Sequence, residues 1–165
     1  MTNGAALVLG SGLGGGFIIN GKLFQGSHFQ AGELTFLLPV QMEKVDPSLM
    51  RGMTLSAVGL ITKVNEVLGN SDLKDGLAAF KAINAGDETV YSLFESYCRN
   101  LAITILNLQT IFDVETFVIG GGISAQPILI KEVNRQFDKV HHEIDFIGKI
   151  IKRPKIVACH HHLSL

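Results

Sequence analysis

The 165-residue chain has no tryptophan, two cysteines and four prolines, and neither sign of charge dominates its surface. Fourteen basic and fifteen acidic side chains give a formal net charge of −1. No apolar run reaches the roughly 18 residues that a membrane-spanning helix needs, and no basic segment precedes a short apolar run as in a signal peptide. These absences predict a cytoplasmic protein that does not enter a membrane.

Two further absences concern nucleic acids and metals. The only basic cluster is Lys149, Lys152, Arg153 and Lys155, which is smaller than the basic surface of a nucleic-acid groove. The run His160-His161-His162 does not predict a metal site, because adjacent residues on a strand point to opposite faces. We therefore expect no nucleic-acid partner, and we assign no metal ligand.

The chain is instead rich in glycine and in apolar residues. Eighteen glycines are present, 47% of the residues are apolar, and the mean hydropathy is +0.32. Such a composition predicts a real core together with apolar surface that packs on another domain or subunit. We therefore expect a homodimer or a larger assembly.

Two glycine-rich segments each follow a short apolar run. Residues Gly10-Ser11-Gly12-Leu13-Gly14-Gly15-Gly16 follow 5–9, and Gly120-Gly121-Gly122 follow 116–119. A glycine-rich turn exposes backbone N–H groups and lets another molecule approach the main chain. Two such turns at strand ends indicate one ligand with two ends, such as a nucleotide held at its phosphates and its base.

The first segment alone leaves two interpretations open. It has no G-x-G-x-x-G before a helix and no Gly-Lys-Ser/Thr, so it is neither a dinucleotide fingerprint nor a Walker loop. The residues that follow, Phe17-Ile18-Ile19-Asn20, are typical of another strand. A glycine-rich hairpin connection and a phosphate-binding turn are both compatible with this pattern.

The order of predicted elements indicates an α/β protein. Asn20-Gly21 is a strong hairpin signal, and 26–47 is irregular with glycine and proline at intervals. Apolar periodicity predicts strands at 5–10, 16–20, 22–24, 115–119 and 155–159, and helices at 48–68, 72–85, 87–112 and 126–142. A meander of three strands is thus followed by helices and then by strand, helix and strand.

This order and several sequence blocks resemble the C-terminal lobe of the ROK family of repressors, open reading frames and kinases. The blocks are 9–16, Asn20-Gly21-Lys22-Leu23, Ala31-Gly32-Glu33, Ala85-Gly86-Asp87 and 117–124. The resemblance implies a ribonuclease H-like lobe of the actin-like ATPase kind. Its mixed sheet would combine a three-stranded meander with two parallel strands, flanked by helices.

The resemblance also implies an ATP-dependent sugar kinase, with ATP in a cleft between two lobes. Glu33 would accept hydrogen bonds from sugar hydroxyls, and Mg²⁺ would be bound mainly through the phosphates and the other lobe. The phosphate contacts would be Gly10, Ser11, Gly12, Gly14 and Gly15, and the adenosine contacts Gly120, Gly121, Gly122 and Ile123.

The chain departs from the family pattern at several points. Phe36 stands where the family often has His, residues 37–53 contain no Cys or His, and the position of a second sugar-contacting Glu falls near Met53. The resemblance is therefore to a branch without structural zinc. An Asp-x-Gly-Gly-Thr loop and an Asn-Asp pair are also missing, so we expect 1–165 to be a single lobe without the N-terminal lobe or a catalytic residue.

Two other functions remain open at this stage. A sugar-sensing repressor of the same family would keep the fold and the sugar site but carry its DNA-binding region elsewhere. A lobe that only mediates dimerisation would bind neither nucleotide nor sugar. The glycine turn at 10–16 favours the kinase, because a repressor need not hold phosphate.

Overall fold

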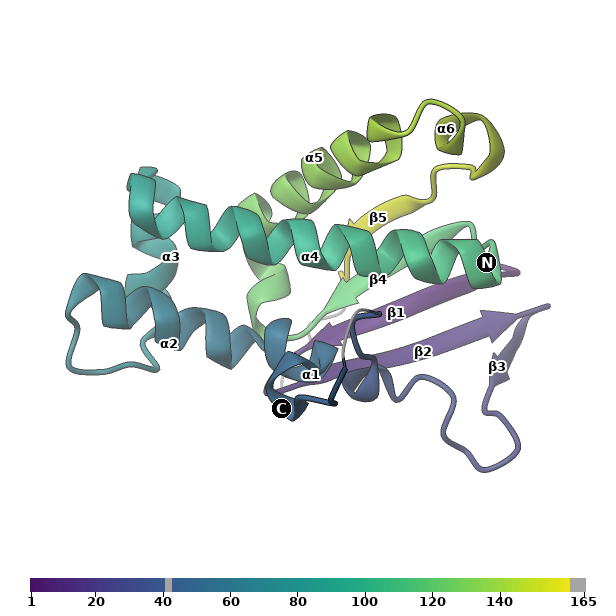
Figure 1. Cartoon of the computed structure of the whole chain (residues 1–165), viewed down its shortest axis with the longest axis horizontal. Coiled ribbons are helices and arrows are strands. Elements are labelled where there is room, and N and C mark those ends of the chain that lie inside the picture. Colours follow the sequence, from purple (N-terminus) through teal and green to yellow (C-terminus); the bar gives the residue numbers. More distant parts are fainter. Residues whose placement is uncertain (41–42, 161–165) are drawn as a thin grey trace.

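The computed structural model describes residues 1–40 and 43–160, and its centre is a five-stranded mixed sheet (Figure 1). The strands are β1 (Gly4–Leu9), β2 (Leu13–Ile19), β3 (Lys22–Phe24), β4 (Thr116–Gly120) and β5 (Lys155–Ala158). They lie in the order β3-β2-β1-β4-β5. The first three are antiparallel, whereas β4 is parallel to β1 and β5 is parallel to β4. The expected meander with two parallel strands is confirmed.

The hairpin between β2 and β3 follows from its two turn residues. Ile19 pairs with Lys22, so the loop contains only Asn20 and Gly21. Both have a positive φ, 52° and 75°, which is the conformation of the two-residue turns that match the twist of a hairpin. The Asn-Gly signal therefore predicted this connection correctly.

Six α-helices and three short 3₁₀ helices occur in the described residues. The 3₁₀ helices are η1 (Leu34–Phe36), η2 (Pro47–Leu49) and η3 (Gly122–Ala125). The α-helices are α1 (Arg51–Thr54), α2 (Ala57–Leu68), α3 (Gly76–Ala85), α4 (Glu88–Phe112), α5 (Pro127–Glu143) and α6 (Ile147–Ile150). None of these helices is long and apolar enough to cross a membrane.

Three of the α-helices begin at a capping side chain. Ser56, Asp75 and Asp87 each accept a hydrogen bond from the backbone N–H three residues later, at 2.9–3.0 Å. This bond satisfies one of the donors that the first turn of a helix leaves unpaired. The predicted helix 48–68 is therefore wrong as a single unit, because the cap at Ser56 separates α1 from α2. The predicted start at 72 is also too early, since Asp75 caps α3.

The core lies between the sheet and the helices. Alternate residues of the strands are buried, among them Leu7, Leu9, Phe17, Phe117 and Ile119. The ring of Phe17 stacks on Phe112 of α4 at 4.2 Å between centroids. α4 lies over the sheet with α5 beside it, while α2 and α3 extend beyond the end at which β1 and β4 finish (Figure 1).

Candidate functional site

The two glycine-rich segments meet at one end of the sheet. Because β1 and β4 are parallel neighbours, Gly10 and Gly121 follow strands that end side by side. Gly121 has a φ of +100°, and a Cβ added there would overlap the Leu9 carbonyl oxygen. Only glycine permits this close approach, so the second turn rests directly on the end of β1.

A pocket of about 400 Å³ lies between these turns and the two helices beyond them. The turns supply backbone groups, and the helices supply a mainly apolar wall. Its lining residues are Leu9, Gly10, Ala57, Val58, Ile61, Gly76, Leu77, Phe80, Gly122, Ile123 and Gln126. An apolar slot with a few backbone donors at its edge suits a flat, weakly polar group such as a nucleobase.

The first turn is shorter than the sequence predicted. It consists of Gly10, Ser11 and Gly12, whereas Gly14, Gly15 and Gly16 lie inside β2 and pair with β1. Within the described part of the chain, the backbone N–H groups of Ser11 and Gly12 have no hydrogen-bond acceptor. These two donors are therefore available to an anion, and the turn remains chemically suited to phosphate.

The start of α2 also faces this turn. The Gly10 carbonyl accepts the Ala57 N–H at 2.9 Å and the Ser56 hydroxyl at 3.4 Å. The positive end of the α2 dipole thus lies beside the turn, where it favours a negative charge. The bond from Ser56 joins Gly10 to a residue 46 positions away in the sequence.

Glu33 lies beside β2, and two glycines allow the segment around it to approach that strand closely. A Cβ on Gly32, whose φ is +95°, would overlap the Gly15 carbonyl oxygen. A Cβ on Gly15 would lie 2.5 Å from a methyl carbon of Leu34. The glycines of β2 therefore admit the segment that carries Glu33, a role that the sequence did not reveal.

The side chain of Glu33 is exposed and has no hydrogen-bond partner in residues 1–40 and 43–160. Phe36, which stands three residues later, is 64% exposed. Sequence reasoning missed a third residue of this segment, Thr35, whose hydroxyl binds the backbone of Leu13. No motif indicated it, because the contact joins residues that are 22 positions apart.

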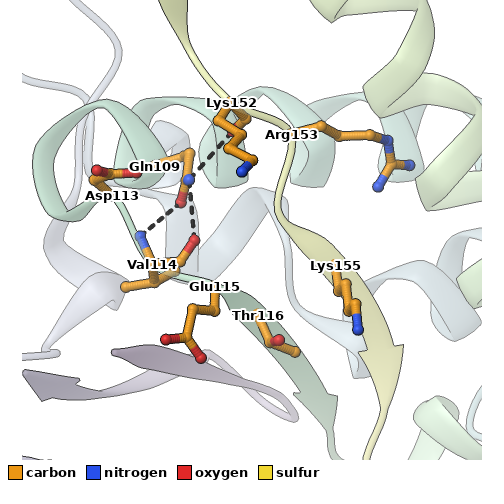
Figure 2. A pocket seen from close by; sticks show the side chains of 8 residues that line it. All are labelled: Gln109, Asp113, Val114, Glu115, Thr116, Lys152, Arg153 and Lys155. Atoms are coloured by element: carbon orange, nitrogen blue, oxygen red, sulfur yellow. Dashed lines mark hydrogen bonds between the residues drawn. The ribbon is translucent and has the colours of Figure 1, made fainter. Parts of the chain in front are cut away.

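A second pocket, of about 540 Å³, lies at the opposite end of the sheet, where β4 and β5 begin (Figure 2). The buried amide of Gln109 bonds both backbone groups of Val114 and the carbonyl of Lys152. Arg153 points away and binds Asp138 at 2.6 Å (Figure 2). The buried amide at this end of the sheet is thus paired within the protein, and neither glycine-rich segment lines this pocket.

No group of three or more His, Cys, Asp or Glu side chains that could hold a metal ion occurs among the described residues. Two histidines of the run at 160–162, His161 and His162, lie outside those residues. The absence of structural zinc remains an expectation from the sequence of 37–53.

Comparison with known proteins identifies sugar kinases as relatives. An N-acetyl-D-glucosamine kinase of Vibrio vulnificus (strain YJ016) is 29% identical over 166 residues, covering 94% of this chain and 53% of the relative. A beta-glucoside kinase of Klebsiella pneumoniae is 30% identical over 131 residues, covering 77% of this chain and 43% of the relative. The chain spans about half the length of the curated relatives it matches.

Solved structures show the same fold. A ROK family protein from Streptococcus pneumoniae TIGR4, in complex with sucrose, has a TM-score of 0.82 and 29% identity, covering 99% of this chain and 54% of that one. A ROK family glucokinase from Streptomyces griseus, in complex with glucose and AMPPNP, has a TM-score of 0.77, 20% identity and coverages of 95% and 55%. A ROK family transcriptional regulator homologous to the E. coli MLC protein has a TM-score of 0.69, 20% identity and coverages of 96% and 42%.

The ROK family domain matches residues 1–151, which is nearly the whole chain. The fold class that the sequence predicted, a mixed sheet flanked by helices as in the actin-like ATPases, agrees with these neighbours. The chain therefore belongs to the ROK family.

Proposed function

We propose that residues 1–165 form the nucleotide- and sugar-binding lobe of an ATP-dependent sugar kinase. The observation that carries this proposal is that the turns at 10–12 and 120–122 meet around an apolar pocket. In addition, the close approach of Gly32 to Gly15 brings Glu33 beside β2, the strand that follows the first turn. A nucleotide and a sugar would thus bind beside the same short stretch of β1 and β2.

In this proposal the adenosine occupies the pocket beside Gly120, Gly121, Gly122 and Ile123. The phosphates extend past Gly10, Ser11 and Gly12, and the free N–H groups of Ser11 and Gly12 donate to their oxygens. The Gly10 N–H already donates to the Gly12 carbonyl at 3.2 Å, so Gly10 borders the phosphates without donating to them. Gly14 borders the path of the phosphates from within β2. Gly15, the other phosphate contact expected in this strand, faces the opposite side and lies against Leu34, so we assign it to the packing of the Glu33 segment. Mg²⁺, bound through the phosphates, would neutralise their charge.

The acceptor in this proposal is a sugar hydroxyl, in keeping with the N-acetyl-D-glucosamine and beta-glucoside kinases among the relatives. A carboxylate can accept hydrogen bonds from two hydroxyls at once, which is the role we assign to Glu33. The exposed ring of Phe36 adds an apolar surface on which the face of a pyranose can lie. The location would be cytoplasmic, where ATP is abundant.

Nucleotide binding tests this proposal directly. Calorimetry of the 165-residue chain with AMPPNP and Mg²⁺ should show binding that Gly14→Val weakens by about tenfold or more, because bulk at Gly14 blocks the phosphate path. The substitution should leave the fold intact, since a Cβ at Gly14 would be 3.5 Å from Val8, an ordinary contact. Gly16→Val is the matched control, because Gly16 shares the face of β2 with Gly14 and has open space. Equal affinity in both variants would contradict the phosphate assignment.

A sugar-sensing repressor lobe is the second candidate, because a ROK family transcriptional regulator has the same fold. The same titrations separate the two functions. A repressor lobe should bind glucose or a glucoside but not AMPPNP, whereas a lobe that serves only dimerisation should bind neither.

We also propose that the chain forms a homodimer. The long helix α4 does not supply the apolar surface for a partner, because its apolar stripe is buried in the core. Exposed apolar side chains elsewhere include Leu23, Phe24 and Phe29, which we propose contribute to the dimer surface. Light scattering should give a mass of two chains or more, and a monomer over a wide concentration range would contradict this.

A further inference from the structure

Thr35 lies two residues after Glu33, and its hydroxyl reaches the strand that leaves the first glycine turn. Its Oγ1 accepts a hydrogen bond from the Leu13 N–H at 3.1 Å and donates one to the Leu13 carbonyl oxygen at 3.2 Å. Leu13 directly follows Gly12 and opens β2. One side chain thus binds both backbone groups of the residue at which the turn becomes a strand.

Two glycines enclose this side chain. A Cβ on Gly12 would lie 2.9 Å from the Thr35 Oγ1, and a Cβ on Gly52 of α1 would lie 2.6 Å from the same atom. Any residue other than glycine at either position would have to displace Thr35 or move itself. The threonine is therefore held between the turn on one side and α1 on the other.

Thr35 is one of three contacts between the Glu33 segment and β2, and Leu34, which lies against Gly15, is another. The third is the approach of Gly32 to Gly15, so the segment is fixed on both sides of Glu33. The turn itself is also fixed from two directions, by Thr35 at Leu13 and by the start of α2 at Gly10. A displacement of Glu33 must therefore move Leu13 or break a hydrogen bond.

We propose that Thr35 is a positioning residue that couples the sugar site to the nucleotide site. It contacts neither ligand in this arrangement, and the proposal rests on the function proposed above. A sugar that orders the Glu33 segment also orders the turn at 10–12 through the Thr35 hydroxyl, so that each ligand binds more tightly when the other is present. Such coupling between two binding sites is reciprocal.

The hydrogen bonds can be tested without any ligand. Thr35→Val keeps the shape of the side chain and removes the hydroxyl, whereas Thr35→Ser keeps the hydroxyl. Amide hydrogen exchange at Leu13, followed by NMR, should be faster in the valine variant and close to wild type in the serine variant. Unchanged exchange in Thr35→Val would overturn the link itself, whatever the chain binds.

The coupling is measured by titrating AMPPNP and Mg²⁺ with and without saturating glucose. The wild-type chain should bind AMPPNP more tightly when glucose is present. Thr35→Val should reduce this advantage by roughly two- to tenfold, the equivalent of a lost hydrogen bond, and Thr35→Ser should restore it. An advantage that Thr35→Val leaves unchanged would overturn the coupling.

A substitution outside both sites provides a second test. Gly52→Ala should displace Thr35 and reproduce the effect of Thr35→Val although the hydroxyl is still present. Gly16→Ala is its control, because a Cβ there meets nothing within 4 Å. A wild-type chain that fails to bind AMPPNP would refute the proposed function and the coupling together, whereas the exchange rate at Leu13 would still report on the hydrogen bonds.

Discussion

Gly121 and Gly122 are neighbours, but only Gly121 occupies a position that requires glycine. Gly121 has a φ of +100° and lies against the backbone of Leu9, whereas a Cβ added to Gly122 would meet no atom within 4 Å. Gly121→Ala should therefore lower the free energy of unfolding by about 1–3 kcal/mol, the usual cost of a strained backbone residue. Urea denaturation of the 165-residue chain measures this change.

Gly122→Ala is the control for that prediction. The free energy of unfolding should stay the same or rise by up to about 1 kcal/mol, because alanine restricts the unfolded chain. If both variants lost the same stability, the close approach of Gly121 to Leu9 would not be the reason that the second turn needs glycine.

At the scale of elements, a buried carboxylate joins α4 to α5. Glu132 on α5 is only 3% exposed. It accepts hydrogen bonds from Arg135 at 2.7 and 2.9 Å, from Gln136 at 3.0 Å and from Tyr91 of α4 at 3.1 Å. Burial opposes ionisation of Glu132, but these donors outweigh it and hold the pKa of the carboxyl below its usual value. The charge of Glu132 therefore stabilises the packing of the two helices.

This lowered pKa predicts how stability changes with pH. The stabilisation is complete above the pKa of glutamate in the unfolded chain, about 4.3, and is lost as the pH falls through the lower folded value. Glu132→Gln should lower the free energy of unfolding at pH 7 by about 1–3 kcal/mol, because the donors lose a charged acceptor. Between about pH 5 and about pH 3, on either side of that pKa, the free energy of unfolding should fall less in the variant than in the wild-type chain. Urea denaturation at each pH measures this difference.

Glu143→Gln is the matched control on the same helix. Glu143 pairs with Arg99 at 2.8 Å, but the two side chains are 51% and 36% exposed. An exposed pair contributes less than about 1 kcal/mol, so this variant should be close to wild type at pH 7. A loss equal to that of Glu132→Gln would contradict the importance of burial.

At the scale of the whole molecule, our proposal gives the chain binding groups and assigns none of its residues as the base for phosphoryl transfer. In that reaction the sugar oxygen attacks the γ-phosphorus, the bond to the ADP oxygen breaks, and the hydroxyl proton passes to a carboxylate. Glu33 is the carboxylate that we place at the sugar, and its assigned role is to bind hydroxyls. Loss of a positioned base costs about 10²–10⁴-fold in rate, and our proposal leaves the other half of the phosphate site to a second lobe.

We therefore expect the isolated 165-residue chain to bind nucleotide without turnover. A coupled assay with ATP, Mg²⁺ and a panel of hexoses and glucosides should show only background rates. Addition of a lobe that carries the Asp-x-Gly-Gly-Thr loop should raise the rate of phosphoryl transfer above background. Turnover by the isolated chain that disappears in Glu33→Gln would contradict this, because Glu33 would then be the base.

The sequence by itself determined the order of elements, the hairpin at Asn20-Gly21 and the two glycine-rich segments. These features depend on apolar periodicity and on turn chemistry, which are properties of neighbouring residues. Only the tertiary structure decided that Gly14 and Gly15 belong to β2, that Ser56 separates two helices, and that Thr35 binds Leu13. Each of these depends on a contact between segments far apart in the chain. Gly32 approaches Gly15, and the Gly10 carbonyl binds the start of α2. Gly12 and Gly52 leave the space that Thr35 occupies. Local patterns carry no information about such contacts until the sheet has brought the segments together.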